Sequence, residues 1–431
     1  GEGFIKFSLK IAGRFIGGPA KVAVISSALF GSISGSASAN VASTGVFTIP
    51  MMKKIGYDKN FASAVEATAS SGGQIMPPIM GAGAFIMAEL IQTPYLKIAI
   101  AASIPALLYF YSVGTGIHFY SLKEGKKGLP PEEIPTTTET IKATLFFIIP
   151  LTTLVVLLVK GFTPQYAAFW TVMITIILFP INTSWSIDLK SIWKKIYKGT
   201  INGARQAAII GSITACAQII IGIINQTGLG VKLSSFILDF SKNNLFLALI
   251  LTMITSIILG MEVPTTAAYL VAVVIGGPTL IKLGVNPIAA HLFVFYFAII
   301  SAITPPVCGA VYIAAGIADA NWIKAAKFAI LLGFSAFIIP YLFVYDPSLL
   351  LLSNPLSIIY GLIRSILAVT LISAAGMGYL RTPLNSFQRI LLFLVSILFI
   401  IKNLYLNLIG IGIIVILYYF YLKSPSSKYA K

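Results

Sequence analysis

Apolar stretches long enough to cross a lipid bilayer recur along the whole chain, and most charged residues lie between them. A helix that crosses about 30 Å of hydrocarbon needs roughly 20 residues, because each residue adds about 1.5 Å. The pattern therefore predicts a series of ordinary membrane helices. They cover about 8–30, 96–119, 141–160, 163–182, 200–225, 244–259, 323–345, 356–376, 386–402 and 405–422.

Two further apolar regions, 31–92 and 260–320, are broken by Gly, Pro, Ser, Thr and Asn. We expect each region to hold a re-entrant helical hairpin followed by a broken helix. Irregular backbone is tolerated inside a bilayer only where it is buried in protein or lines a watery cavity. The hairpins are predicted near 31–50 and 260–279, with non-helical tips at 31–40 and 260–268, and the broken helices at 60–92 and 285–320.

The two broken regions are copies of each other. A shift of 228 positions (305 minus 77) superposes the loop KKIGYD on IKLGVN and the segment QIMPPIMGA on AITPPVCGA. An odd number of predicted crossings separates the copies, so the second copy is expected to be inverted. Inverted copies with interruptions at matching positions point to a secondary transporter whose site lies near the bilayer midplane. We divide the chain into a first repeat at 1–119, connecting scaffold helices at 120–243, a second repeat at 244–345 and C-terminal scaffold helices at 346–431.

Composition narrows the class of protein. Hydrophobic residues make up 57% of the 431 residues and charged residues only 10%, too few to cover a water-soluble globule. The net charge of +17 does not indicate nucleic-acid binding, because the basic residues gather in short loops between apolar stretches. We place these loops in the cytoplasm and expect the C-terminus there too. Residues 184–198, where Trp and Ile are interleaved with Lys, predict an interfacial amphipathic helix or, alternatively, a cytoplasmic loop.

The unwound tips offer chemistry that suits an ion and an acid. Backbone carbonyls and hydroxyls bind a hard cation, and the free amide groups at the start of the next helix attract an anion. Sodium and a carboxylate fit these two ends. Glu262, in the second tip, is either a cation partner or a proton-linked carboxylate, since charge inside a membrane is usually functional. For Glu66 and Glu89 we expect positions near the ends of a broken helix, where a carboxylate reaches water.

Other reactive side chains indicate no enzymatic site. The breaks carry no paired carboxylates and no His-rich motif, which argues against a membrane enzyme such as an acyl or isoprenyl transferase. His118 and His291 have no second ligand at metal spacing, so packing or a local hydrogen bond is expected for each. Arg364, within an apolar stretch, has no explanation at this level.

The segments GSISGSASANVAS, IPMMKKIGYD, GQIMPP, GMEVPTTAAYLV and ITPPV together resemble the large membrane subunit of tripartite ATP-independent periplasmic (TRAP) transporters. The segment PTTAAY resembles the sequences of the fused-subunit branch of this family, which works with TAXI-type binding proteins. The resemblance implies sodium-driven uptake across the inner membrane, in which an extracytoplasmic binding protein delivers an organic acid. It also implies elevator movement of both hairpins against a scaffold. Against that family the chain looks truncated at its amino terminus, so that a small membrane subunit or further helices are expected as partners.

The resemblance also implies the residues of the site, with sodium as the coupling ion and no cofactor. The first sodium site would use Ser34, Gly35, Ser36, Asn40, Ser71 and Gly72. The second would use Gly260, Thr265, Thr266, Thr304 and Pro305. The substrate would lie between the tips, against Ser36, Ser38, Asn40, Pro264, Thr265 and Thr266. Glu262 departs from the family, in which a small residue is expected at this place.

Two alternatives stay open from the residues alone. Four broken segments could line the pore of a passive channel, although inverted copies within one chain suit alternating access better. A proton-coupled transporter of another small solute would use the same architecture.

Overall fold

The computed structural model describes residues 2–178, 189–261, 263–417 and 419. The regular secondary structure of this part of the chain is helical, apart from one isolated β-bridge between Tyr379 and Pro383. The α-helices are α1 (Glu2–Ala12), α2 (Gly18–Ser34), α3 (Ala37–Lys54), α4 (Lys59–Gly72), α5 (Gly81–Leu90), α6 (Tyr95–Lys123), α7 (Thr137–Val159), α8 (Pro164–Leu178), α9 (Leu189–Gln226), α10 (Leu229–Ser241), α11 (Leu245–Gly260), α12 (Thr265–Lys282), α13 (Pro287–Ile300), α14 (Gly309–Ala318), α15 (Trp322–Tyr345), α16 (Pro355–Met377), α17 (Ser386–Ile400) and α18 (Leu404–Leu417). Short 3₁₀ helices are η1 (Gly73–Ile75), η2 (Pro131–Glu133), η3 (Ser301–Ile303) and η4 (Pro347–Leu350).

Within the described residues, six helical segments are long and apolar enough to cross a bilayer. They lie in α6, the stretch that ends with α7, α9, α12, α15 and α16. Large apolar side chains such as Ile177, Ile219 and Val415 are exposed on the surface, where a bilayer rather than water is the suitable solvent. The predicted all-α membrane fold is confirmed.

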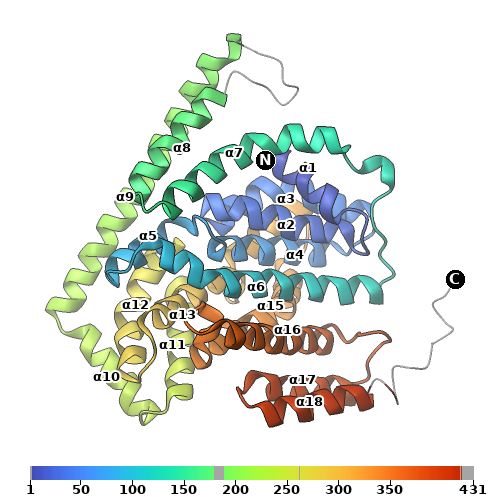
Figure 1. Cartoon of the computed structure of the whole chain (residues 1–431), viewed down its shortest axis with the longest axis vertical. Helices are drawn as coiled ribbons and strands as arrows, with labels where there is room; N and C mark the ends of the chain where they lie inside the picture. Colours follow the sequence, from blue (N-terminus) through green and yellow to red (C-terminus); the bar gives the residue numbers. More distant parts are fainter. Residues whose placement is uncertain (1, 179–188, 262, 418, 420–431) are drawn as a thin grey trace.

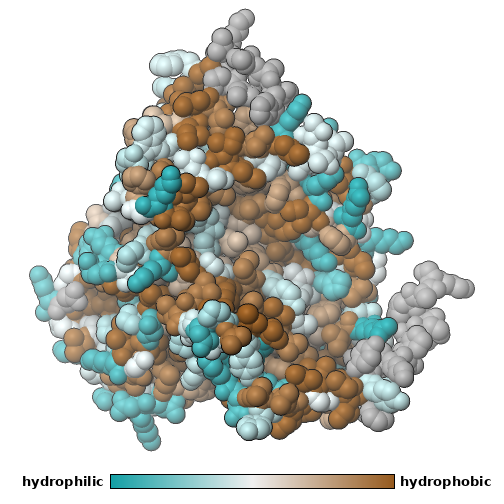
Figure 2. All heavy atoms as spheres, in the orientation of Figure 1, coloured by the Kyte–Doolittle hydropathy of each residue, from teal (hydrophilic) through white to brown (hydrophobic). Residues whose placement is uncertain are grey.

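Figure 1 shows how these helices are arranged. The first four helices, drawn in blue, lie beside α6 and α7, whereas α8 and α9 run along the outer edge of the molecule. Helix α16 packs against α6, α15 and α17, and α17 and α18 lie beyond it at the lower right of the view. Apolar side chains dominate the face shown in Figure 2, and hydrophilic ones gather mainly toward its left and right edges, near the ends of the helices that run across the view.

The repeat found in the sequence recurs in the helix bounds. Adding 228 to the bounds of α3 gives those of α12, and the same shift carries α4 onto α13, η1 onto η3 and α5 onto α14. The bonds Pro77-Pro78 and Pro305-Pro306 are both cis. The two copies therefore share helix bounds as well as sequence. The inverted orientation of the second copy stays a prediction.

The turn between the first two repeated helices explains the shared loop sequence. Gly56 and Gly284 adopt left-handed conformations with φ of 85° and 86°, which glycine reaches without a Cβ clash. Two residues later Asp58 and Asn286 cap the next helices, because their side-chain oxygens accept hydrogen bonds from free backbone N–H groups. The loops KKIGYD and IKLGVN therefore encode the same turn and helix start.

Three predictions about local structure were wrong. Residues 8–30 do not form one helix: α1 ends at Ala12, and Gly17 with φ of 70° precedes α2. A Cβ on Gly18 would lie 2.0 Å from the Gly13 carbonyl oxygen, so this corner depends on glycine. The predicted amphipathic helix is not separate either, because its described part belongs to the long helix α9. Residues 184–188 lie outside the described residues.

The third correction concerns the width of the hairpin tips. The helices α2 and α3 pack together and are separated only by Gly35 and Ser36, so most of the predicted tip at 31–40 is helical. Gly35 ends α2 in the left-handed region, and the Ser36 hydroxyl accepts a hydrogen bond from the Ala39 amide, which starts α3 at once. In the second copy α11 ends at Gly260 and α12 begins at Thr265. Both hairpins are accordingly longer than predicted.

Candidate functional site

The two hairpin tips meet at one cavity of about 380 Å³. Its walls come from both tips, from the starts of α5 and α14, and from one face of α9. The lining residues are Ser34, Gly35, Ser36, Ala37, Ser38, Ala82, Gln206, Ile209, Ile210, Ile213, Gly260, Val263, Pro264, Thr265, Thr266, Ala302, Gly309 and Ala310. The central expectation from the sequence, that residues more than 200 positions apart converge here, is therefore met.

Close backbone packing shapes the first tip. Gly35 has φ of 61°, and a Cβ at this position would lie 2.4 Å from the Cα of Gly81 at the start of α5. Gly81 also has a positive φ, of 67°, and faces Gly35 in return. Only glycine satisfies both the conformation and the contact. The tip is thus held directly against the break that precedes α5.

Gln74 in η1 links the two tips. Its side chain is 1% exposed. With its amide nitrogen directed at the tips, it donates to the Thr265 hydroxyl at 2.7 Å and to the Gly35 carbonyl at 3.1 Å, while its oxygen accepts from the Ala37 amide at 3.2 Å. Sequence reasoning placed Gln74 in the break but omitted it from the site. Gln74 is the one residue with a polar side chain in the segment GQIMPP, and this feature could have identified it as part of the site.

The second tip is fastened to the break of its own repeat. The Ser301 hydroxyl donates to the Gly260 carbonyl at 2.9 Å, and a Cβ on Gly260 would lie 2.5 Å from that hydroxyl oxygen. The Thr304 hydroxyl donates back to the Ile300 carbonyl at 2.9 Å, within its own helix turn. Pro305 and Thr304 are not among the residues that line the cavity. Glu262 lies outside the described residues.

The remaining residues predicted for the first sodium site lie behind the cavity. Asn40 is fully buried and donates to the Ser27 carbonyl at 2.8 Å and the Ser70 carbonyl at 3.3 Å. Ser71 bonds the Ala67 carbonyl of its own helix, and Gly72 packs against the Tyr109 ring. Asn40 on α3 and Ser71 and Gly72 on α4 thus lie behind the tip, whereas Ser34, Gly35 and Ser36 line the cavity. Their role in binding sodium stays a prediction.

No Lys, Arg, Asp or Glu is among the described residues that line the cavity. An anion bound there would rely on hydroxyls, the Gln206 amide and the N–H groups at the starts of α3 and α12. Those helix starts carry partial positive charge. The arrangement suits a small polar molecule with one acidic group, surrounded on the α9 side by isoleucine.

Two other polar positions differ from expectation. Glu66 does not lie near a helix end in reach of water: it is fully buried in the middle of α4, where hydroxyls from three helices surround it. Glu89 is exposed at the end of α5, as expected. Arg364 now has an explanation, because its guanidinium pairs with Asp346 at 2.6 Å. His291 makes the expected local hydrogen bond, to Tyr269 at 2.8 Å.

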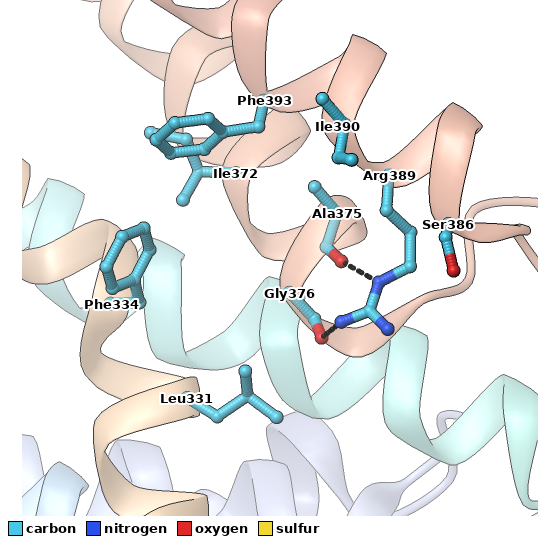
Figure 3. A pocket seen from close by; sticks show the side chains of 9 residues that line it. All are labelled: Leu331, Phe334, Ile372, Ala375, Gly376, Ser386, Arg389, Ile390 and Phe393. Atoms are coloured by element: carbon cyan, nitrogen blue, oxygen red, sulfur yellow. Dashed lines mark hydrogen bonds between the residues drawn. The ribbon is translucent and has the colours of Figure 1, made fainter.

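A second cavity, of about 460 Å³, lies between α15, α16 and α17. Figure 3 shows that its walls are mostly apolar, with Phe334, Ile372 and Phe393 around it. The Arg389 guanidinium points to the end of α16, where it donates to the Ala375 carbonyl at 2.7 Å and the Gly376 carbonyl at 2.9 Å. This arginine caps a helix, so the cavity offers no comparable set of convergent polar groups.

Comparison with known proteins gives a consistent picture. Residues 1–357 match the family described as "Tripartite ATP-independent periplasmic transporter, DctM component". The chain is 24% identical over 361 residues to the sialic acid TRAP transporter large permease protein of Vibrio cholerae, covering 84% of this chain and 83% of that protein. It is 23% identical over 358 residues to the 2,3-diketo-L-gulonate TRAP transporter large permease protein of Escherichia coli, covering 81% and 80%.

A further relative is the isethionate TRAP transporter permease protein of Oleidesulfovibrio alaskensis, 24% identical over 321 residues. The match covers 74% of this chain but 49% of that protein. The chain therefore spans about half the length of this relative.

Proposed function

Because the chain belongs to the DctM family of TRAP transporter components, we propose that it is the membrane subunit that carries an organic acid across the cytoplasmic membrane, coupled to sodium. The family consists of transporter subunits and not of enzymes. The observation that carries the proposal is the single cavity at which both hairpin tips meet. A secondary transporter needs such a site between its two repeats.

The cavity supports an acid as the solute. Relatives are named for sialic acid, 2,3-diketo-L-gulonate and isethionate, each of which carries an acidic group. Two helix starts and the hydroxyls of Ser36, Thr265 and Thr266 provide donors to an anion without a basic side chain. Tip carbonyls, such as those of Gly35 and Gly260, are the oxygens that sodium would use. In this proposal the hairpins are re-entrant and move together as an elevator.

The partners follow from the family. An extracytoplasmic binding protein, of the TAXI type by the PTTAAY resemblance, would deliver the acid to the cavity. A small membrane subunit, or helices that act as one, would complete the scaffold. The exposed apolar surfaces of α8 and α9 offer room for such helices. We propose that the C-terminus lies in the cytoplasm.

Uptake into proteoliposomes tests this function. The chain is reconstituted with its binding protein and small subunit, and labelled sialic acid, isethionate and C4-dicarboxylates are offered with an inward sodium gradient. Accumulation above the outside concentration that collapses without the gradient supports sodium-coupled transport. Equilibration without accumulation would identify a passive channel. Accumulation driven only by a proton gradient would remove sodium from the proposal.

A pair of variants connects uptake to the cavity. Thr265→Ala removes the hydroxyl that Gln74 reaches at the second tip and is expected to weaken sodium-dependent uptake. Thr227→Ala removes a hydroxyl that only bonds back to its own helix, outside the cavity, and serves as the matched control. Equal uptake by the two variants would show that the cavity is not the route.

A further inference from the structure

Glu66 lies at the centre of the first repeat, away from the lining of the cavity. Every residue of α4 from Asn60 to Gly72 is buried, and Glu66 itself has no exposed surface. Helices α2, α3, α6, α13, α14 and α15 all pack against α4. A carboxylate at such a place loses the hydration that it would have in water.

Four hydroxyl groups surround the Glu66 carboxyl. Thr44 on α3 lies 2.5 Å from Oε1, with Ser70 at 3.1 Å and Ser27 on α2 at 3.2 Å from the same atom. Thr48 on α3 contacts Oε2. The cluster thus joins three helices through one carboxyl group.

No Lys, Arg or His among the described residues forms an ion pair with Glu66. The basic and titratable groups on the helices around α4 have other partners or lie at the surface. Lys21 contacts His118, and Lys54 contacts Glu133. Lys53 donates to the Ala318 carbonyl, Lys123 to the Met377 carbonyl and Tyr109 to the Thr68 carbonyl, and His291 bonds with Tyr269. Lys97, Lys324 and Lys327 are exposed. A negative charge on Glu66 would therefore stand alone in the core.

The oxygens of the cluster lie at direct hydrogen-bond distances, which leave no room for a metal ion among them. Either of the two hydroxyls on α3 can accept the single hydrogen bond that a protonated carboxyl donates, because each has another acceptor for its own hydrogen. Thr44 lies 2.9 Å from the Asn40 carbonyl, and Thr48 lies 3.1 Å from the Thr44 carbonyl. A neutral carboxylic acid satisfies all of these groups.

The second repeat shows that helix packing alone does not require this cluster. At a shift of 228, Glu66 becomes Val294, Thr44 becomes Ala272, Thr48 becomes Gly276 and Ser70 becomes Ala298. Val294 faces Gly276, since a Cβ on that glycine would lie 3.3 Å from a Val294 methyl group. The same pair of helices thus packs with apolar residues in one copy and with a carboxyl and its hydroxyls in the other.

We propose that Glu66 is a proton-binding site that couples protonation to the conformation of the hairpin α2–α3. In the structure described here Glu66 holds the proton, and its neutral carboxyl joins α2, α3 and α4. Release of the proton to water leaves a carboxylate that must be hydrated, which separates α3 from α4. Thr44 also contacts the Asn40 side-chain oxygen at 3.2 Å, so the change reaches the residue that braces the first tip.

Infrared spectroscopy of the purified protein in lipid tests the proton directly, without any transport. A protonated carboxyl has a carbonyl stretch separate from the bands of a carboxylate. We expect this band at neutral pH in the wild type, its decrease at high pH, and its loss in Glu66→Gln. The control Glu89→Gln makes the same chemical change at an exposed site and should leave the band unchanged. A wild type without the band at neutral pH would overturn the proposal.

A second measurement tests the coupling and rests on the proposed transport function. Glu66→Gln mimics the neutral acid and is expected to fold, but its acid uptake should lose the dependence on pH that the wild type shows. Glu66→Asp keeps a titratable group and should keep a pH dependence. If Glu66→Gln retains the wild-type pH profile, Glu66 does not couple to the hairpin. Failure of uptake in every variant, with the infrared band present, would instead count against the transport function alone.

Discussion

Replacement of Asp346 by asparagine is expected to destabilise the protein more than replacement of its partner Arg364. The two side chains are 1% and 2% exposed, and the Arg364 guanidinium lies 2.6 Å from the Asp346 carboxylate. Lys402 contacts the other carboxylate oxygen at 2.8 Å and is 45% exposed. Asp346 therefore forms ion pairs with two cations, one buried and one in reach of water, and connects the end of α15 to α16 and to the segment between α17 and α18.

The magnitude follows from what each change leaves behind. Asp346→Asn leaves the Arg364 guanidinium buried without an anion, and removal of one partner from a buried ion pair costs about 3–5 kcal/mol. Arg364→Met leaves Asp346 with the hydrogen bonds from Lys402 and Ser348, both at 2.8 Å. The loss there is nearer that of one charged hydrogen bond, about 1.5–3 kcal/mol. The double variant removes both buried charges and should be more stable than Asp346→Asn alone.

Thermal unfolding in detergent at a fixed scan rate, with all variants measured together, gives the order of stability. Such comparisons remain informative when unfolding is irreversible, provided that the scan rate is constant. Lys402→Met serves as the control, because its half-exposed charge is expected to contribute about 0–1 kcal/mol. Arg364→Met unfolding at a lower temperature than Asp346→Asn would refute the reasoning. So would a double variant less stable than either single change.

Three further outcomes are expected. Burial opposes ionisation of Asp346, but hydrogen bonds from Lys402 and Ser348 and the charge of Arg364 hold its pKa below the ordinary value. The contribution of ionised Asp346 to stability is thus complete above about pH 4 and falls as the pH drops through the lowered pKa. Below pH 4 the unfolding temperature of the wild type should therefore fall more than that of Asp346→Asn. Gly31→Ala should lower the unfolding temperature, by about 2 kcal/mol or more in stability, because its Cβ would lie 2.5 Å from the Gly73 Cα, whereas Gly114→Ala has open space and should be near neutral or stabilising. Gln74→Leu should leave expression near normal but reduce acid uptake at least as much as Thr265→Ala does, and uptake equal to that of the wild type would show that the bridge between the tips is not needed.

The sequence by itself determined the class of protein and the position of its repeat. Lengths of apolar stretches decide whether a helix can cross a bilayer, and this property needs no knowledge of the neighbours. The turn at Gly56 and Gly284 and the caps at Asp58 and Asn286 are equally local, which is why the helix bounds repeat at the same shift. The convergence of both tips could be inferred because symmetry relates the two copies.

Local signals also misled where several conformations suit the same residues. Ser, Gly and Asn between 31 and 40 suggested a wide unwound tip, but a single capping serine after Gly35 restores the helix within two residues. The chain at 13–17 reads as apolar helix, yet contacts of Gly13 and Gly18 with each other create a corner.

Only the tertiary structure decided which polar groups meet. The spacing of Thr44 and Thr48, and of Glu66 and Ser70, is four residues, so each pair shares a helix face, and this was the available signal for the cluster. That the two faces point at each other, and that Ser27 joins them, depends on how α2, α3 and α4 cross. Asp346 likewise pairs with Arg364 and Lys402, which lie on later segments of the chain. A membrane-spanning helix can be recognised from one local apolar stretch of sequence. The partners of a buried charge instead depend on packing between segments that are distant in the sequence.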